Sequence, residues 1–289
     1  MPDTAPARPD RLVLLGVKGG PAIRARGAMP TSTLLDLAGQ RIVIDCGLGV
    51  TKALVEAGAD LRTIDHVVIT HLHSDHVLEL GPLLHTAWTT GLARPVAVWG
   101  PPGIGDYLQG FLASMAYDCT IRVHDEGRVP LAQLIDLHVL DEGPVMAVPG
   151  LAMRALRVPH PPLEQCFALR FDARVSVTFS GDTAYFPPLA EFAAGSALLV
   201  HEAMLPEGIE AVIAKTGLGD KLRRHLNASH STVEEAARIA RAAGVGRLVL
   251  NHLIPVDDPA FGEGDWLDRA AAEWDGPVTV GRDGMEIAL

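Results

Sequence analysis

The densest set of metal-capable side chains in this sequence is the hexapeptide His-Leu-His-Ser-Asp-His, which directly follows an apolar run at residues 67–70. On an extended backbone, side chains two positions apart project to the same side, so His71 and His73 can bind one ion. Asp75 and His76 come after the bend and face a second ion. The spacing therefore predicts a site for two metal ions at the end of a strand.

Three more metal-capable residues flank other predicted strands. Two apolar runs that flank Asp172, Ala173 and Arg174 predict a β-hairpin, with strands at residues 166–171 and 175–179. The hairpin brings His160, just before its first strand, and Asp182, just after its second, towards the same end of a sheet. A later strand at 247–250 is followed by Asn251 and His252. Because loops at one rim of a sheet converge, we expect these residues to complete the metal site.

The rest of the chain alternates strand and helix patterns. A helical pattern places Val50 and Leu54 on one face and ends at Gly58. Ser231 and Glu234 have the spacing of a capping box, before a helix that runs to Gly244. Further strands are expected at residues 12–17, 33–37, 42–45, 66–70 and 96–99. This alternation predicts an α/β fold.

Composition favours a well-packed globular protein. The 289 residues are 48% hydrophobic and 20% charged, which leaves little room for extended disorder. We expect a flexible tail at residues 1–10 and a single hydrolase domain at 11–289. No apolar stretch approaches the roughly 18 residues of a membrane span, and no N-terminal signal pattern is present, so we expect a cytoplasmic protein with no membrane association. We leave open whether it forms a homodimer.

Charge and cysteine content narrow the partners. The formal charge of -11 predicts overall repulsion of polyanions and makes a nucleic-acid partner unlikely unless a local basic patch compensates. Cys46, Cys119 and Cys166 are far apart and form no CxxC pair. A disulfide framework or a thiolate zinc site is therefore not expected.

Several motifs resemble those of the metallo-β-lactamase superfamily: THLHSDH, VPH, FSGDT and LNH. The phrases SGDT, HEAM and SHST resemble its ribonuclease Z and arylsulfatase-like branch. The likeness extends from LLGVKGGP near the start to NHLIP near the end. It implies a four-layer αββα sandwich. A Glu in place of His73 would be typical of the di-iron oxidoreductases of the superfamily, so its absence favours hydrolysis.

The resemblance also implies which residues bind each metal. The first ion would be held by His71, His73 and His160, the second by Asp75, His76 and His252, with Asp182 bridging them. Nitrogen and oxygen donors suit two Zn²⁺, and Mn²⁺ or Fe²⁺ can occupy such sites. A hydroxide bridging the two ions would be the nucleophile, with Asp75 orienting it.

Further roles follow from the same likeness. Ribonuclease Z uses a Glu-His dyad beside its metals, and its HEAT and HST phrases correspond here to Glu202 and His230, with Met204 in place of the usual Thr. Tyr185 stands three residues after Asp182, where lactonases of the superfamily have a substrate-contacting tyrosine. A basic cluster with Arg223 and Arg224 suggests a clamp for an anionic substrate group.

The substrate is the least constrained feature. Ribonuclease Z has a long arm that grips tRNA between its third His and its bridging Asp, whereas His160 and Asp182 are only 22 positions apart. With the acidic charge, this favours a small-molecule ester substrate: a phosphodiester, a sulfate ester or a lactone. The alternatives are a tRNA 3′-end processing endoribonuclease and a non-catalytic metal-binding interaction protein.

Overall fold

Two mixed β-sheets of seven strands each form the centre of the computed structural model, which describes residues 8–289. Residues 1–7 of the predicted tail lie outside the described residues. In spatial order, the first sheet consists of β14 (Met285–Ala288), β1 (Arg11–Gly16), β2 (Ser32–Leu37), β3 (Gln40–Ile44), β4 (His66–Val68), β5 (Val96–Gly100) and β6 (Ile135–Val139). The second consists of β13 (Val278–Val280), β12 (Leu248–Ile254), β11 (Leu198–Met204), β10 (Ser176–Phe179), β9 (Phe167–Asp172), β8 (Leu151–Arg157) and β7 (Gly143–Val148).

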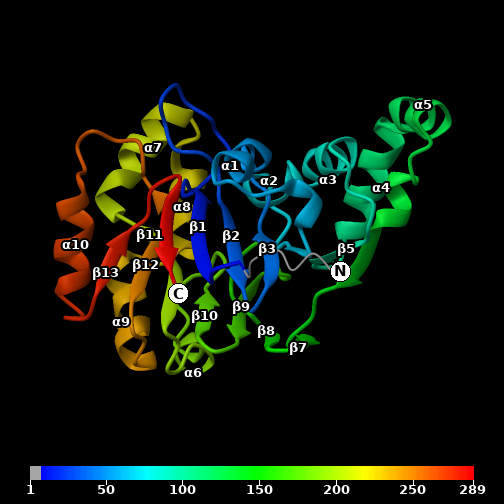
Figure 1. Cartoon of the computed structure of the whole chain (residues 1–289). Helices are drawn as coiled ribbons and strands as arrows, with labels where there is room; N and C mark the ends of the chain where they lie inside the picture. The colour runs from blue at the N-terminus through cyan, green and yellow to red at the C-terminus, as the bar shows by residue number, and fades with distance from the viewer. Residues whose placement is uncertain (1–7) are drawn as a thin grey trace.

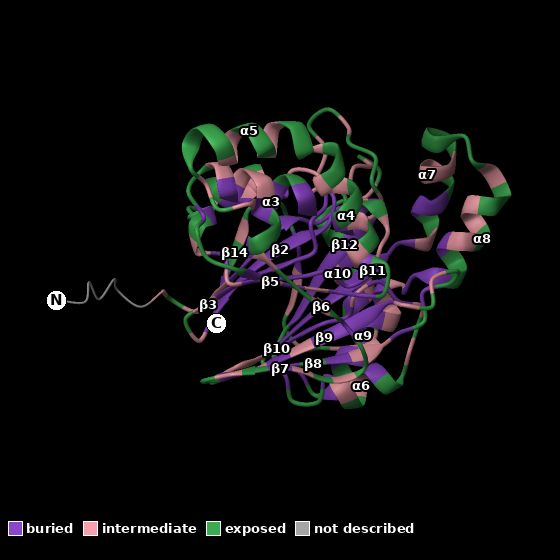
Figure 2. Cartoon of the chain, turned by 90° about the vertical axis from the view of Figure 1, so that its right-hand side faces the viewer, coloured by how far each residue is buried: buried purple, intermediate pink, exposed green. Residues whose placement is uncertain are grey.

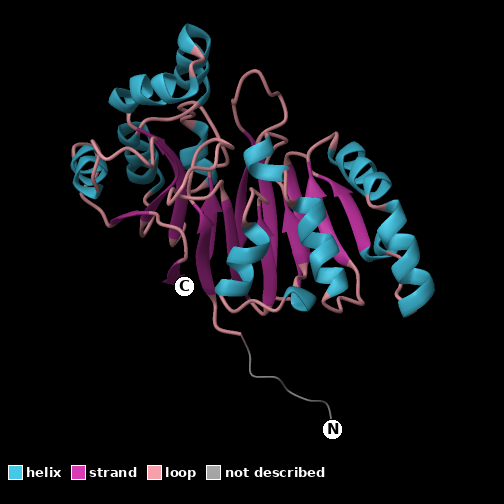
Figure 3. Ribbon diagram, turned by 90° about the horizontal axis from the view of Figure 1, so that it is seen from above, coloured by secondary structure: helices cyan, strands magenta, loops and turns pink. Residues whose placement is uncertain are grey.

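Helices cover the outer faces of both sheets (Figures 1 and 3). The first sheet is covered by α1 (Val50–Glu56), α2 (Ser74–Val77), α3 (Leu80–Thr89), α4 (Ile104–Ser114) and α5 (Ala116–Glu126). The second is covered by α6 (Pro188–Phe192), α9 (Val233–Ala243) and α10 (Glu263–Ala271). Short 3₁₀ turns lie at Leu61–Thr63, Leu131–Leu134 and Pro206–Gly208. The architecture is the expected four-layer αββα sandwich.

The side chains of β1 illustrate how the layers are held together. Successive side chains of a strand point to opposite faces. Leu12 and Leu14 pack into the core between the sheets, whereas Val13 and Leu15 pack under the first helical layer. Both faces are covered, so the strand is apolar along its length rather than alternating.

A helical hairpin, α7 (Ile209–Thr216) and α8 (Gly219–Ser229), stands away from the sandwich (Figure 2). It packs through a small apolar cluster that includes Ile209 and Leu226 against Met204 and Ile254, at the ends of β11 and β12. The hairpin is therefore anchored next to the strand ends that carry the predicted site.

The start of α9 differs by one residue from the prediction. The N-cap is Thr232, whose Oγ1 accepts a hydrogen bond from the Glu235 amide (3.3 Å) while the Thr232 amide donates to Glu235 Oε2 (2.8 Å). The predicted cap, Ser231, instead donates its hydroxyl to the Thr183 carbonyl (2.7 Å). Ser231 ties two loops of the site together, and the helix begins one residue later.

Strand β12 runs past its predicted end and carries His252 within it. Its parallel pairing with β11 shifts register between Glu202 and Ala203, and His252 has a φ of 43°. A positive φ at a non-glycine residue is strained, and such strain is often found at functional sites. Among residues 8–289, no helix is both long and apolar enough to span a membrane.

Candidate metal centre

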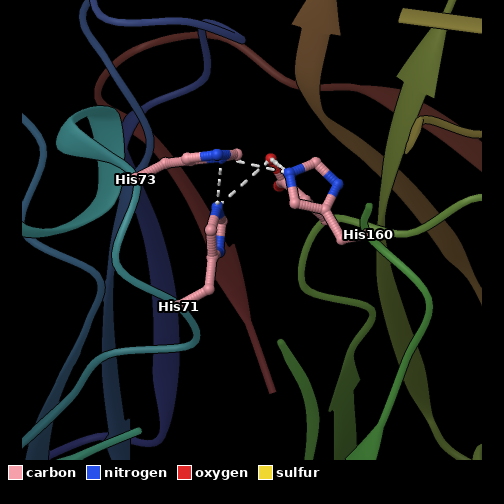
Figure 4. A group of neighbouring side chains, drawn as sticks. His71, His73 and His160 are labelled. Atoms are coloured by element: carbon pink, nitrogen blue, oxygen red, sulfur yellow. Dashed lines mark hydrogen bonds and ion pairs between the residues drawn. The ribbon is translucent and has the colours of Figure 1, made fainter. Parts of the chain in front are cut away.

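Three histidines from the two sheets converge at one end of the sandwich. His71 and His73 lie in the loop between β4 and α2, and His160 follows β8 of the other sheet. His73 Nδ1 lies 3.1 Å from His71 Nε2 and 3.1 Å from His160 Nε2 (Figure 4). The extended backbone predicted for the hexapeptide thus places His71 and His73 side by side.

A second group lies next to the first. Asp75 and His76 come from α2, and His252 comes from β12. Asp75 Oδ2 lies 3.5 Å from His252 Nε2 and 3.7 Å from His76 Nε2. All three side chains are buried. This is the trio that the resemblance implied for the second ion.

Asp182 stands between the two groups. Its Oδ2 lies 3.1 Å from His252 Nε2 and 3.3 Å from His76 Nε2 on one side, and 3.7 Å from His71 Nε2 on the other. It is 2% exposed. One carboxylate therefore contacts the donors of both groups, as a bridging ligand must.

The donor atoms fit metal ions better than they fit one another. The ring nitrogens of His71, His73 and His160 lie 3.1 Å from one another in two contacts, and they cannot all donate protons. Within residues 8–289, the buried Nε2 atoms of His76 and His252 have no hydrogen-bond partner. Buried polar atoms without partners are costly. Cations that accept these lone pairs would remove the cost, and the nitrogen and oxygen donors are of the type that Zn²⁺ prefers.

Outer contacts fix the orientation of two ligands. His76 Nδ1 donates to Asp45 Oδ2 (2.8 Å), and Asp45 Oδ1 accepts from the Thr70 amide (2.8 Å). His160 Nδ1 donates to the Ser229 carbonyl (2.8 Å). With Nδ1 committed to these acceptors, Nε2 is the atom that each ring would offer to a metal ion. Asp45 is a site residue that the metal-binding motifs do not include, although its place at the end of a predicted strand was a signal.

The charges at the site favour cations. Burial lowers the pKa of His71, and that of His160 to about 4, so both rings are neutral at pH 7. Burial alone would raise the pKa of Asp182, but its histidine neighbours, His252 and His76 foremost, outweigh it and hold that pKa well below its usual range. Against the effect of burial, Asp182 and Asp45 in turn raise the pKa of His76, so a bound cation would displace a proton from this ring.

Glu202 and His230 form a buried pair beside the metal ligands. His230 Nδ1 donates to Glu202 Oε2 (2.8 Å), and Glu202 Oε1 accepts from the Thr183 amide. Burial, together with Asp182, raises the pKa of Glu202, and burial lowers that of His230. The ring of His230 stacks on that of His252 with centroids 5.3 Å apart. The dyad implied by the resemblance is thus assembled.

A pocket of about 460 Å³ opens in front of this centre, a volume within the range of small-ligand sites. Metal-site residues line its floor, and Leu218, Leu222 and Leu226 line its wall on the helical hairpin. Its polar lining also includes side chains that the sequence analysis did not single out: Lys18, Arg24, Lys215 and His225. The only sequence signal for Lys18 was its place in the LLGVKGGP phrase.

The three predicted substrate contacts do not line this pocket. Tyr185 is 40% exposed in the loop between β10 and α6. Arg223 pairs with Glu210 (2.7 Å) and with Asp220, and Arg224 is exposed. Substrate contact by Tyr185, Arg223 and Arg224 therefore stays a prediction.

Known proteins resemble this chain over most of its length. Residues 11–249 match the family model described as anti-Pycsar protein Apyc1. Ribonuclease Z of Mycobacterium sp. (strain KMS) is 34% identical over 276 residues, covering 94% of this chain and 93% of that protein. This chain belongs to the metallo-β-lactamase-fold hydrolases. It is thus a metal-dependent hydrolase of ester bonds.

Further relatives agree with this assignment. Ribonuclease Z of Mycobacterium marinum is 34% identical over 277 residues, covering 94% of this hydrolase and 96% of that protein. Among solved structures, YhfI from Bacillus subtilis has a TM-score of 0.71 at 22% identity, covering 97% and 99% of the two chains. The short form of human tRNase Z has a TM-score of 0.68 at 20% identity, covering 96% and 98%. The two solved structures support the fold.

The relatives overturn one expectation. We expected a small-molecule ester as substrate and nucleic acid to be unlikely, yet the curated relatives that span 94% of this hydrolase are named ribonuclease Z. The expectation was wrong because a net charge of -11 averages over the whole surface. A substrate meets the local field of the pocket, where Lys18, Arg24 and Lys215 lie.

Proposed function

We propose that this hydrolase is an endoribonuclease of the ribonuclease Z type, which cleaves precursor tRNA at its 3′ end with two Zn²⁺ ions. The observation that carries the proposal is the position of Asp182, whose Oδ2 contacts ring nitrogens of both predicted metal groups at 3.1–3.9 Å. Relatives at 34% identity that bear the ribonuclease Z name support the choice of substrate.

When bound, a pair of such cations polarises a phosphoryl oxygen and makes hydroxide available near neutral pH. The protein's own groups do the rest. Asp75 is held ionised because His76 and His252 outweigh the effect of burial on its pKa, so its carboxylate can accept a hydrogen bond from an attacking water and orient it. The Gly20 amide donates to Asp75 Oδ2 (2.8 Å) and fixes its orientation.

His230 has the geometry of a proton donor to the leaving oxygen. Its Nδ1 is committed to Glu202, so Nε2 is the atom left for the pocket that His230 lines. Glu202 stabilises the positive charge that forms when the ring takes up a proton. This pair therefore serves the 3′ oxygen that departs when the phosphodiester breaks.

RNA must reach this centre without an arm between His160 and Asp182. That stretch consists of a turn and the β9–β10 hairpin, which pairs in antiparallel register. The pocket instead opens between the loop at residues 18–24 and the α7–α8 hairpin. We assign RNA contacts to these two walls.

The test is cleavage of precursor tRNA by the Zn²⁺-loaded enzyme, with product ends mapped by gel and sequencing. We expect one cut at the 3′ side of the mature tRNA, loss of cleavage with a chelator, and none with Asp182→Ala. Bis(p-nitrophenyl) phosphate serves as the matched simple diester. Hydrolysis of this diester or of a cyclic mononucleotide with no cleavage of precursor tRNA would overturn the proposal.

A further inference from the structure

A nearly buried lysine lies beside the metal centre and has no role in the metal site. Lys18 is 9% exposed, yet its ammonium group makes no hydrogen bond within residues 8–289. Its nearest carboxylate is Asp257, whose Oδ2 lies 3.9 Å from Nζ, beyond hydrogen-bond distance. Three N–H donors are thus held in the pocket lining without acceptors.

The backbone at Lys18 is fixed on all sides. Its amide donates to the Met29 carbonyl (2.9 Å), and its carbonyl accepts from Thr31 Oγ1 (3.1 Å). The next residue, Gly19, packs so closely that an added Cβ would lie 2.9 Å from His252 Cε1. Lys18 is therefore held in place at the edge of the metal centre.

Two more cations line the same pocket. Arg24 is half-buried and has no ion-pair partner in the described part of the chain, and Lys215 donates to Asp258 Oδ2 (3.1 Å). Burial, with opposition from Asp257, lowers the pKa of Lys18, and Arg24 and Lys215 add to the lowering because like charges repel. The positive charges of these three side chains therefore repel one another. The nearby carboxylates of Asp257 and Asp258 offset only part of this repulsion.

The carboxylate of Asp257 is only partly hydrogen-bonded. Its Oδ1 accepts from the Ala28 amide (2.9 Å), but its buried Oδ2 has no hydrogen-bond partner within residues 8–289. At 3.9 Å the charges of Lys18 and Asp257 attract each other, but the ammonium group makes no direct hydrogen bond to the carboxylate. Its N–H groups are therefore left for a ligand in the pocket that both residues line.

We propose that Lys18, supported by Arg24 and Lys215, forms a phosphate-binding subsite that holds an RNA phosphate next to the one being cleaved. This inference rests on the proposed ribonuclease function and adds the residues that bind the substrate backbone. The metal site would hold the scissile phosphate, and Lys18 lines the same pocket as the metal-site residues, directly before Gly19, which packs against His252. The aliphatic wall of Leu218 and Leu222 faces the same pocket and suits a base or ribose.

The test compares an anion that has neighbouring phosphates with one that has none. Bis(p-nitrophenyl) phosphate is the reporter substrate, and tetrauridylate is added as a competitive inhibitor. Lys18→Met keeps the aliphatic stem and removes the charge. We expect it to raise the Ki of tetrauridylate about 10- to 100-fold, the usual effect of losing a charged hydrogen bond, and to change kcat and KM of the reporter by less than about 3-fold.

Two variants control for a structural role. Lys18→Arg keeps the charge and should hold the Ki of tetrauridylate within about 5-fold of the wild type. Lys52→Met removes an exposed lysine on α1 and should leave both constants unchanged. Lys18→Met should also lower the slope of log Ki against log salt by about 0.7, the contribution of one contact to a single strand.

Several outcomes would overturn the subsite. If Lys18→Met leaves the Ki of tetrauridylate unchanged, Lys18 does not bind a neighbouring phosphate. If the KM of the reporter rises as much as the Ki of tetrauridylate, Lys18 contacts the scissile phosphate instead. If only the Ki of inorganic phosphate responds, the site holds free phosphate and not substrate. These results can be separated from a failure of the proposed function, because hydrolysis of the reporter does not depend on tRNA cleavage. If precursor tRNA is not cleaved, the Ki of tetrauridylate can still be compared between the wild type and Lys18→Met.

Discussion

His230 Nδ1 and Glu202 Oε2 lie 2.8 Å apart although the two residues belong to different elements, the loop before α9 and strand β11. Both side chains are buried, and the Thr183 amide holds the other oxygen of Glu202. The contact fixes the tautomer of His230 and leaves its Nε2 for the pocket. This geometry fits the role that we propose for the pair, which is to hand a proton to the leaving group.

We predict that His230→Ala lowers kcat on precursor tRNA by about 10² to 10⁴, the usual range for general acid catalysis. The loss should be much smaller on bis(p-nitrophenyl) phosphate, because nitrophenolate departs without a proton. Metal content, measured in parallel, should stay at that of the wild type. Loss of an ion would mean that His230 acts as a ligand, since it also lies near Asp182 and His252.

Asp182→Ala should release both ions together. Its Oδ2 contacts His252 Nε2 at 3.1 Å and His71 Nε2 at 3.7 Å, so one substitution weakens both groups. Elemental analysis should give about two ions per chain for the wild type and for Asp136→Ala, a surface control on β6, and far fewer for Asp182→Ala. A single ion that survives the substitution would contradict the binuclear site.

Asp45→Asn should weaken metal binding about 10- to 100-fold without removing a ligand, as is typical of outer-sphere partners. Asp45 accepts from His76 Nδ1 (2.8 Å) and from the Thr70 amide (2.8 Å). Asn keeps the shape but loses the charge that orients the ring. Competition with a chromophoric Zn²⁺ chelator measures the change, and a wild-type affinity would show that His76 needs no such support.

The stability of the metal-free protein should fall on mild acidification. Burial lowers the pKa of His160 from 6.5 to about 4, so below pH 6.5 the unfolded chain takes up a proton that the folded chain refuses. The contribution is present above pH 6.5 and is lost as the pH falls to about 4. Calorimetry should show a steeper decline of Tm in this window for the wild type than for His160→Asn. Equal slopes would contradict the burial of a neutral ring.

The local part of the metal site was predictable from the sequence. Spacing of two residues places His71 and His73 on one side of any extended backbone, and the observed 3.1 Å contact follows from that geometry alone. The hairpin at residues 167–179 likewise follows from two apolar runs around a polar turn. Such features depend on neighbours in the chain, so sequence order suffices to find them.

The long-range partners were not predictable in the same way. Asp45 reaches His76 because β3 and β4 are adjacent parallel strands in the first sheet, and Lys18 meets Asp257 because the loops after β1 and β12 lie together. The capping residue was displaced to Thr232 because Ser231 bonds to Thr183, a contact between two loops.

By itself, the sequence determined the donor types and the α/β class, because these follow from residue identity and short spacings. Its resemblance to the metallo-β-lactamase superfamily added the αββα sandwich and the hydrolytic chemistry. The tertiary structure alone decided how charge is distributed. A net charge of -11 predicted repulsion of RNA, but folding gathers Lys18, Arg24 and Lys215 in the lining of one pocket. Electrostatic attraction falls off with distance and is screened by salt, so a substrate responds to the charges beside it and not to the sum over the chain.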